Sequence, residues 1–164
     1  MKMRTRRLAI AGLSAVGILD ALYMLAYDEG LIDSLICPFF GEGCNIVGRS
    51  EHAKHFGVPN AAVGAVGYAA MASLALWAGD KPPYRRPIQP LALSAIAAGA
   101  AAASAFLIYE QKAKVRAWCF WCLMSAGING ALLPLSLGDS IPAWRALRRN
   151  LAGRRLRERK NRAA

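Results

Sequence analysis

Long stretches of this sequence contain almost no charged residues. Four apolar runs cover residues 8–26, 61–79, 90–109 and 119–138, and only the first holds an acidic or basic residue, Asp20. Each run is roughly 19 to 20 residues long, the length that an α-helix needs to cross about 30 Å of hydrocarbon. Helices this apolar have almost no polar face with which a soluble protein would cover them, so the pattern argues against a soluble fold.

The four runs predict an all-α integral membrane protein. Backbone polar groups inside a lipid bilayer must be satisfied within the segment, so each run is expected to be a helix. Glycine and alanine are frequent in all four, which favours close packing of helices in a membrane. We therefore predict a bundle of four transmembrane helices. No clear cleavage site follows the first run, so we expect it to be a retained anchor rather than a signal peptide.

Basic residues are scarce in one connection and abundant elsewhere. Residues 27–60 contain only Arg49 and Lys54, whereas most of the 21 basic residues lie near the two termini and in the connection at 80–87. Cytoplasmic segments of membrane proteins carry the excess of lysine and arginine. This rule predicts that both termini are cytoplasmic and that the loop at 27–60 faces outward.

The same sorting divides the chain into three parts. We expect a basic cytoplasmic N-terminus at residues 1–7, a membrane domain at 8–138 and a basic cytoplasmic tail at 139–164. The connection at 110–118 would share the outer side with the large loop. The basic tail is interpreted as a topology signal that attracts anionic lipid headgroups, and not as a nucleic-acid-binding segment.

The sequence has only four cysteines, and the predicted topology places all of them on the outer side. Cys37 and Cys44 lie in the large loop, in "CPFFGEGC", and Cys119 and Cys122 open the fourth apolar run, in "CFWC". The outer face of a bacterial membrane is the oxidising side, where disulfides form and persist. The cysteines can therefore be structural disulfides, metal ligands or redox pairs.

Each of the first two alternatives has a weakness. A site of four thiolates, helped by His52 and His55, would be a metal site, but six residues separate the loop cysteines and zinc sites usually have two to four. A structural bridge between Cys119 and Cys122 would close too small a loop to stabilise the fold much. A disulfide between Cys119 and Cys122 that is repeatedly formed and reduced fits this spacing better.

A redox relay explains the arrangement of both pairs. Cys119 and Cys122 begin a helix, where free backbone N–H groups and the helix dipole favour a thiolate. They also lie near the membrane boundary, within reach of a lipid-soluble molecule. The loop pair would exchange with a thiol protein outside and pass electrons to the helix pair, which would reduce a quinone. The non-redox alternatives are a metal-binding membrane protein and a structural membrane protein with inert disulfides.

Two motifs resemble a known family. The segment "CNIVGRSEHAKHFGVP" and the later "CFWC" are similar to bacterial members of the vitamin K epoxide reductase family, over roughly residues 8–138. The matching positions in the first motif are Cys44, Val47, Ser50, Phe56, Gly57 and Pro59. The spaced pair precedes the Cys-x-x-Cys pair, which distinguishes this family from the disulfide-bond protein B family, where the order is reversed.

The resemblance implies a role for each cysteine. Cys37 would react with a thioredoxin-like partner, Cys44 would pass electrons to Cys119, and Cys122 would lie nearest the quinone. Ser50 would order the segment above the site. Residues 50–56 are expected to form a short interfacial helix within the outer loop that caps the bundle.

The resemblance also implies a function. The chain would be a membrane thiol:quinone oxidoreductase of the bacterial inner membrane, with its active site on the periplasmic side. It would reoxidise a separate periplasmic thioredoxin-like (DsbA-like) protein, reduce ubiquinone or menaquinone without a metal, and so support disulfide formation in secreted proteins. Vertebrate members have a tyrosine four residues after the second active-site cysteine, where this chain has Ala126, which favours a respiratory quinone over vitamin K epoxide.

Four further residue types are candidates around the quinone. Asp20, an acid within a span, is expected to hydrogen-bond inside the bundle or to position quinone or protons. Asn60 is a candidate for contacting the quinone, and Trp121 for anchoring the helix at the interface and walling the pocket. His52 and His55 could ferry protons, but their place in a polar loop predicts solvated side chains.

Overall fold

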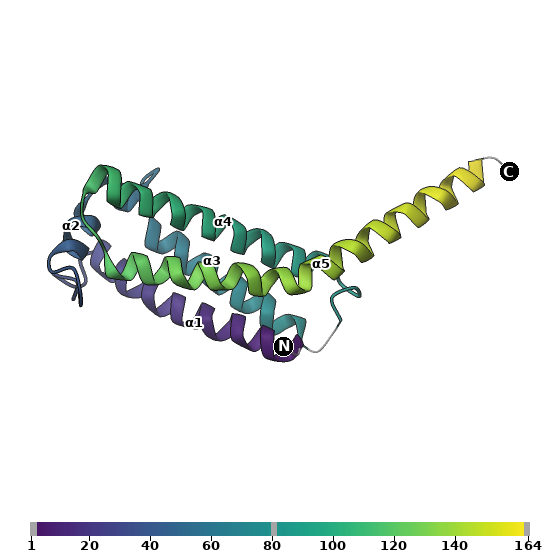
Figure 1. Cartoon of the computed structure of the whole chain (residues 1–164), viewed down its shortest axis with the longest axis horizontal. Helices are drawn as coiled ribbons and strands as arrows, with labels where there is room; N and C mark the ends of the chain where they lie inside the picture. Colours follow the sequence, from purple (N-terminus) through teal and green to yellow (C-terminus); the bar gives the residue numbers. More distant parts are fainter. Residues whose placement is uncertain (1–2, 80–81, 163–164) are drawn as a thin grey trace.

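The fold is an up-and-down bundle of four long helices (Figure 1). This computed structural model describes residues 3–79 and 82–162, and the side chains of 154–160 and 162 are excluded from the description. The bundle helices are α1 (Met3–Asp28), α3 (Asn60–Ala78), α4 (Ile88–Glu110) and α5 (Phe120–Arg162). All four are long and apolar enough to cross a membrane. The prediction of an all-α four-helix membrane bundle is confirmed.

Residues 29–59, which we name the capping segment, cover one end of the bundle. They contain a short helix, α2 (Gly43–Arg49), a 3₁₀ turn, η1 (Glu51–Ala53), and a small antiparallel hairpin of β1 (Lys54–His55) and β2 (Val58–Pro59). Figure 1 shows α2 at one end of the bundle and the start of α1 at the other end. The C-terminal part of α5 projects beyond the bundle at the same end as the start of α1. The two termini are therefore on one side of the bundle and the capping segment on the other.

The short helix of the capping segment lies earlier than predicted. Residues 50–56 were expected to be helical, but α2 ends at Arg49 because Ser50 adopts an extended conformation (φ −72°, ψ 153°). Phe56 and Gly57 both have positive φ, at 54° and 78°. Two successive residues of that kind form the tight turn that joins hairpin strands, so this part of the segment folds as a hairpin.

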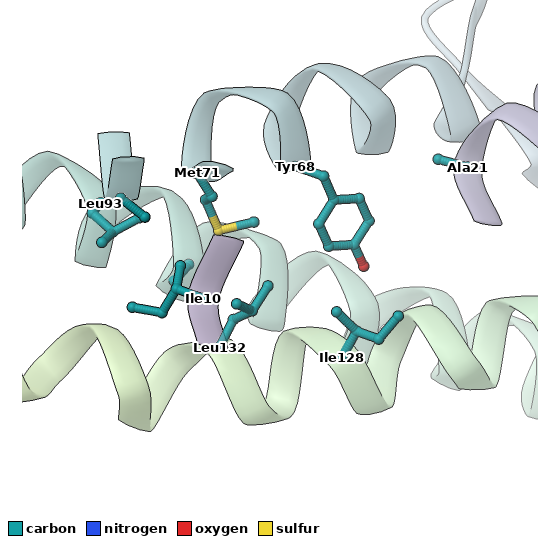
Figure 2. Packing of buried hydrophobic residues seen from close by; sticks show 9 residues of the cluster. Ile10, Ala21, Tyr68, Met71, Leu93, Ile128 and Leu132 are labelled. Atoms are coloured by element: carbon teal, nitrogen blue, oxygen red, sulfur yellow. The ribbon is translucent and has the colours of Figure 1, made fainter. Parts of the chain in front are cut away.

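The core of the bundle lies where the four long helices meet, and α4 contributes Leu93 and Ala97 to it. Figure 2 shows Ile10, Tyr68, Met71, Ile128 and Leu132 packed together from α1, α3 and α5. The packing depends on a small residue, because a Cβ on Gly17 of α1 would lie 2.6 Å from the ring of Tyr68. Glycine at this position lets the tyrosine ring occupy the space between the two helices, as small residues do in membrane bundles.

Helix α5 continues without interruption through the predicted boundary at residue 138. It includes Pro134 and Pro142 and extends to Arg162, beyond the bundle (Figure 1). Asp139 is buried and accepts hydrogen bonds from Arg6 and from Arg7 Nε, the latter at 2.8 Å. The start of α1 and the middle of α5 are thus joined by buried ion pairs at the end opposite the capping segment.

Candidate functional site

The four cysteines gather at the capped end of the bundle in two different states. Cys37 and Cys44 form a disulfide, with Cα atoms 5.7 Å apart, while Cys119 and Cys122 are free thiols. Cys44 lies in the first turn of α2, Cys119 directly precedes α5, and Cys122 lies in the first turn of α5. The structure therefore has the loop pair oxidised and the helix pair reduced.

Cys44 and Cys119 belong to one buried cluster. Both side chains are fully buried, and they pack in the same cluster with Leu35 and Val47 of the capping segment. The approach is close because Gly43 has no side chain: a Cβ there would lie 2.3 Å from the carbonyl oxygen of Trp118. The N-terminus of α2 can thus rest directly on the segment that leads into α5.

Cys119 is the N-terminal cap of α5. Its carbonyl oxygen accepts the N–H of Leu123 at 3.1 Å, and its Sγ accepts the N–H of Cys122 at 3.4 Å. The side chain of Gln111, itself buried, accepts the backbone N–H of Cys119 at 2.8 Å. Gln111 begins η2 (Gln111–Val115), the π-helical turn that follows α4, and thus fixes the start of α5 from there. Sequence reasoning missed Gln111, since nothing in "YEQKAKVR" marks it apart from other polar residues of the connection.

The same arrangement changes the acidity of the Cys119 thiol. The Cys122 thiol and the backbone N–H groups of Cys122 and Trp121 donate hydrogen bonds to its sulfur, which together lower the pKa of Cys119 despite burial. Hydrogen bonds to the charged form of a group favour that form. Cys119 is thus the sulfur that the start of α5 stabilises as a thiolate, as the helix position predicted.

Cys122 faces a different environment, a cavity between the helices. With Asp20, Asn60 and Trp121 it lines a cavity of about 80 Å³ that opens to the outside. The remaining wall is mostly apolar and comprises Ala21, Met24, Ala61, Gly64, Ser104, Leu107 and Ser125. Apolar walls with a few polar groups are typical of sites for small organic molecules. The structure brings together three of the four residues predicted to accompany the cysteines.

Asp20 offers an unused polar atom to this cavity. The side chain is buried in α1, and its Oδ1 has no hydrogen-bond partner among the described residues. The hydroxyl of Ser125, which lines the same cavity, is hydrogen-bonded to the hydroxyl of Tyr68 at 2.7 Å. A buried carboxyl oxygen without a partner is costly unless a ligand or water meets it. The cavity therefore combines a mostly apolar wall with a buried polar atom that lacks a partner.

Trp121 connects the cavity to the loop disulfide. Its indole N–H donates to the carbonyl of Ile36 at 2.8 Å, and the N–H of Ile36 donates to the hydroxyl of Tyr23 at 3.0 Å. The rings of Tyr23 and Trp121 meet edge to face, with centroids 4.9 Å apart. These contacts fix the backbone of Ile36, the residue before Cys37. The side chains of Ile36 and Phe39, which flank Cys37 in the chain, are each 75% exposed.

Ser50 lies away from the cavity, and Asn60 serves the capping segment as well. The hydroxyl of Ser50 donates to the carbonyl of Val47 at 2.7 Å, which fixes the joint between α2 and η1. The amide of Asn60 donates to the carbonyl of His52 at 2.8 Å, and its oxygen lies 2.9 Å from Nδ1 of His55. Both residues thus order the segment above the site, and Asn60 also lines the cavity.

The expectation that the two histidines are simply solvated is wrong. His52 Nδ1 lies 3.1 Å from Oε1 of Glu110, and His55 Nε2 lies 3.3 Å from Oε2 of the same side chain. Lys114 contacts Glu110 as well, at 2.9 Å. Glu110 is buried at the end of α4 and was not singled out from the sequence. Its burial depends on the hairpin folding back onto α4, which no local pattern predicts.

Nothing in residues 3–79 and 82–162 forms a group of three or more histidine, cysteine, aspartate or glutamate side chains that could hold a metal ion. Two of the four sulfurs are bonded to each other, and the other two separate toward the loop and the cavity. The sulfurs thus form two pairs at the capped end, one a disulfide and the other two free thiols.

Comparison with known proteins agrees with this arrangement. Residues 8–137 match the vitamin K epoxide reductase family. The chain is also 32% identical, over 126 residues, to the thiol-disulfide oxidoreductase LTO1 of Arabidopsis thaliana. The aligned part is 74% of this chain and 33% of that relative, so the chain spans about a third of the length of the plant protein. Because the family match covers all four long helices at their bundle portions and both cysteine pairs, this chain belongs to the vitamin K epoxide reductase family.

Proposed function

We propose that this protein is a thiol:quinone oxidoreductase of the bacterial inner membrane. It would reoxidise a separate periplasmic thioredoxin-like (DsbA-like) protein and reduce ubiquinone or menaquinone. The observation that carries the proposal is the placement of the sulfurs. Cys44 and Cys119 share one buried cluster, while Cys122 lines an apolar cavity with an unpaired carboxyl oxygen. The plant relative is a thiol-disulfide oxidoreductase by name, which supports the same chemistry.

The first step is exchange between the partner and the loop disulfide. A thiolate of the partner attacks Cys37, the Cys37–Cys44 bond breaks, and the partner's second thiol then displaces Cys37. The partner becomes a disulfide and the loop pair a dithiol, so two electrons enter the chain. The exposed apolar side chains of Ile36 and Phe39 beside Cys37 suit contact with such a partner.

The second step carries the electrons into the bundle. Cys44 attacks Cys119 in its oxidised form, the Cys119–Cys122 bond breaks, and Cys37 then attacks Cys44 to release Cys119. A thiol of low pKa leaves faster from a mixed disulfide. The lowered pKa of Cys119 therefore favours completion of the transfer, which restores the loop disulfide and leaves a dithiol at the start of α5.

The third step oxidises the helix pair. The Cys119–Cys122 dithiol loses two electrons and two protons as its S–S bond forms, and a quinone in the cavity gains both to become a hydroquinone. Cys122 lies on the cavity wall with Asp20 and Ser125, whose carboxyl and hydroxyl O–H groups would donate hydrogen bonds to the oxygens of the ring. Trp121 closes the cavity toward the loop.

The expected location follows from charge and from the shape of the bundle. The two termini lie at the end opposite the capping segment (Figure 1), and they carry most of the basic residues. With those basic ends in the cytoplasm, all four cysteines would face the periplasm, where secreted proteins acquire their disulfides.

A direct test is quinone reduction by the purified full chain in lipid vesicles, with dithiothreitol as the electron donor. The wild-type protein is expected to reduce a short-chain ubiquinone or menaquinone, and Cys122→Ala to lose this activity altogether. The matched control is Ser136→Ala in the same helix, a buried hydroxyl that donates to the carbonyl of Leu133 at 2.7 Å and does not line the cavity. Unchanged turnover in Cys122→Ala would contradict the proposal.

A further inference from the structure

The Glu110 cluster has no part in the electron transfer steps, yet it adjoins the site. Glu110, His52, Asn60 and Cys122 line one cavity at the capped end. This cavity shares Met24, Asn60, Ala61, Leu107 and Cys122 with the cavity proposed to hold the quinone. The buried carboxylate therefore opens onto a space that leads to the reactive sulfur.

Asn60 decides which ring nitrogen of His55 carries a proton. The amide nitrogen of Asn60 faces the carbonyl of His52, so its amide oxygen faces Nδ1 of His55 at 2.9 Å. An amide oxygen only accepts hydrogen bonds, and His55 must therefore donate from Nδ1. The other ring nitrogen, Nε2, is left to face Oε2 of Glu110 at 3.3 Å.

His55 Nε2 and Glu110 Oε2 lie close enough to exchange one proton, and Oε2 has no hydrogen bond to another described residue. If Glu110 is ionised, Nε2 carries the proton and His55 is a cation. If His55 is neutral, the proton is on Glu110. A proton shared between a carboxyl and an imidazole in a site away from bulk water is suited to transfer, because either partner can hold it.

A second histidine connects this proton to the outside. His52 Nδ1 lies 3.1 Å from Oε1 of Glu110, and His52 Nε2 lies 3.7 Å from Oε1 of Glu51. Side-chain exposure rises along this path, from 3% for Glu110 to 23% for His52 and 90% for Glu51. An imidazole can accept a proton at one nitrogen and release another at the other, so His52 can refill Glu110 from solvent.

We propose that Glu110 and His55 deliver a proton to the quinone that the Cys119–Cys122 dithiol reduces, and that His52 refills them. The inference rests on the proposed function. In one turnover the O–H bond of Glu110 breaks as a quinone O–H bond forms, and the second proton comes from the dithiol as its S–S bond closes. The other thiol proton is released toward the capped face, from which one proton returns to Glu110 through His52. Two electrons and two protons are thus balanced.

The charged groups around Glu110 come from four elements. His52 and Glu51 lie on η1, His55 on β1 and Lys114 on η2, and Asp28 of α1 lines the same cavity. Lys114 contacts Glu110 through the partly exposed side of the cluster and does not adjoin the cavity. Its loss would remove an ion pair of Glu110 without interrupting the path from His52 to His55.

The test distinguishes proton delivery by Glu110 from a purely structural role of the Glu110 cluster. Wild type, Glu110→Gln, Glu110→Asp and the control Lys114→Gln are compared as full chains in lipid vesicles, with dithiothreitol and a short-chain ubiquinone, from about pH 5 to about pH 8, where histidine changes its charge. For wild type we expect kcat to fall as pH rises and the cluster loses its protons. Glu110→Gln should lose about 10²-fold in kcat, the usual contribution of acid–base catalysis, with a flat pH profile and little change in KM.

Two further comparisons complete the expected pattern. Glu110→Asp, which keeps a carboxyl, should retain a falling pH profile, and so should Lys114→Gln, which removes a cation beside Glu110 but leaves the path from His52 to His55. His55→Gln, at a partly exposed side chain that tolerates replacement more readily, should reproduce the loss and the flat profile even where Glu110→Gln does not fold. In every variant that folds, reduction of the oxidised protein by dithiothreitol should keep its wild-type rate, since that half-reaction needs no proton at the quinone.

Other results would overturn the inference. A Glu110→Gln or His55→Gln protein that keeps the wild-type dependence of kcat on pH would show that the cluster is only a clamp, whatever the absolute rate. If these variants lost the same factor in the rate at which dithiothreitol reduces the oxidised protein, the defect would not be specific to proton delivery, and the inference would fail. Failure of the proposed function looks different, because wild type itself would then reduce no quinone at any pH.

Discussion

Gly43 in α2 and Trp118 before α5 touch through their backbones. A Cβ on Gly43 would lie 2.3 Å from the Trp118 carbonyl oxygen, a distance that real Cβ atoms do not adopt. Each of these residues is followed in the chain by a cysteine of the relay, Cys44 and Cys119, and the two cysteines share one buried cluster. The missing side chain of Gly43 is thus what allows the loop pair to approach the helix pair.

Gly43→Ala should slow electron transfer between the two pairs. The added methyl group must push α2 away from Trp118, and a displacement of about 1 Å between reacting groups can reduce a rate about 10²-fold. We expect quinone reduction driven by a reduced thioredoxin-like protein to fall at least about tenfold on this argument. Gly130→Ala is the matched control, since nothing lies within 4 Å of a Cβ there. Equal rates in the two variants would contradict the role given to Gly43.

The Cys119 thiol should titrate at a lower pH than an ordinary cysteine. Its pKa is lowered mainly by the hydrogen bond from the Cys122 thiol. Thiolate should therefore persist at pH values where a free cysteine, with a pKa of about 8.5, is protonated, and it should disappear as the pH falls through the lowered pKa. The ultraviolet absorbance of the thiolate, measured against pH with the loop disulfide intact, reports this titration.

Replacing Cys122 provides the control for that titration. In Cys122→Ala the donor thiol is absent, although the backbone N–H groups remain, so the inflection of the absorbance curve should move to higher pH. An inflection that stays in place would mean that Cys122 does not set the acidity of Cys119.

Cys37→Ala should separate two kinds of electron donor. Without Cys37 the loop has no disulfide for a partner protein to attack, and turnover with a reduced thioredoxin-like protein should be lost. Dithiothreitol is small enough to reduce the Cys119–Cys122 pair without the loop, so its turnover should persist. Quinone reduction measured with both donors decides the matter, and equal loss with both would argue against the order of the relay.

Asp20→Leu should weaken quinone binding more than catalysis. The carbonyl oxygens of a quinone only accept hydrogen bonds, so Asp20 would bind the ring by donating its carboxyl proton, and leucine, which is similar in size, has no such donor. A neutral hydrogen bond contributes about 0.5–1.5 kcal/mol, so KM for quinone should rise by a factor of about 2 to 10 with a smaller change in kcat. Ser14→Ala on the same helix, buried and away from the cavity, should leave KM unchanged. A wild-type KM in Asp20→Leu would contradict a contact between Asp20 and quinone.

The sequence predicted those features that depend on a continuous pattern. The four spans are uninterrupted apolar runs, and the cysteine pairs are separated by recognisable spacings, so both could be identified locally. Asp20 stood out because an acid within a span is rare. In the structure it lines one cavity with Asn60, Trp121 and Cys122, and a contact of these residues with quinone remains a prediction.

Contacts between distant segments could not be identified in this way. Glu110 is buried only because the hairpin at 54–59 folds back onto the end of α4, and Gln111 reaches Cys119 only because Arg116 turns the chain with a positive φ of 55°. Arginine has no preference for that conformation, so the turn is set by tertiary packing. The short helix was misplaced for a similar reason, because burial of Cys44 and Val47 favours residues 43–49 over the more polar 50–56.

The most direct test of the relay is to trap its intermediate. In the double variant Cys37→Ser, Cys122→Ser only Cys44 and Cys119 remain, and mild oxidation of the purified chain should join them in an intramolecular disulfide that peptide mass spectrometry identifies. The account predicts this Cys44–Cys119 bond in most of the molecules, because both sulfurs lie in one buried cluster. Free thiols after oxidation, or disulfides only between separate molecules, would contradict the transfer of electrons from the loop pair to the helix pair.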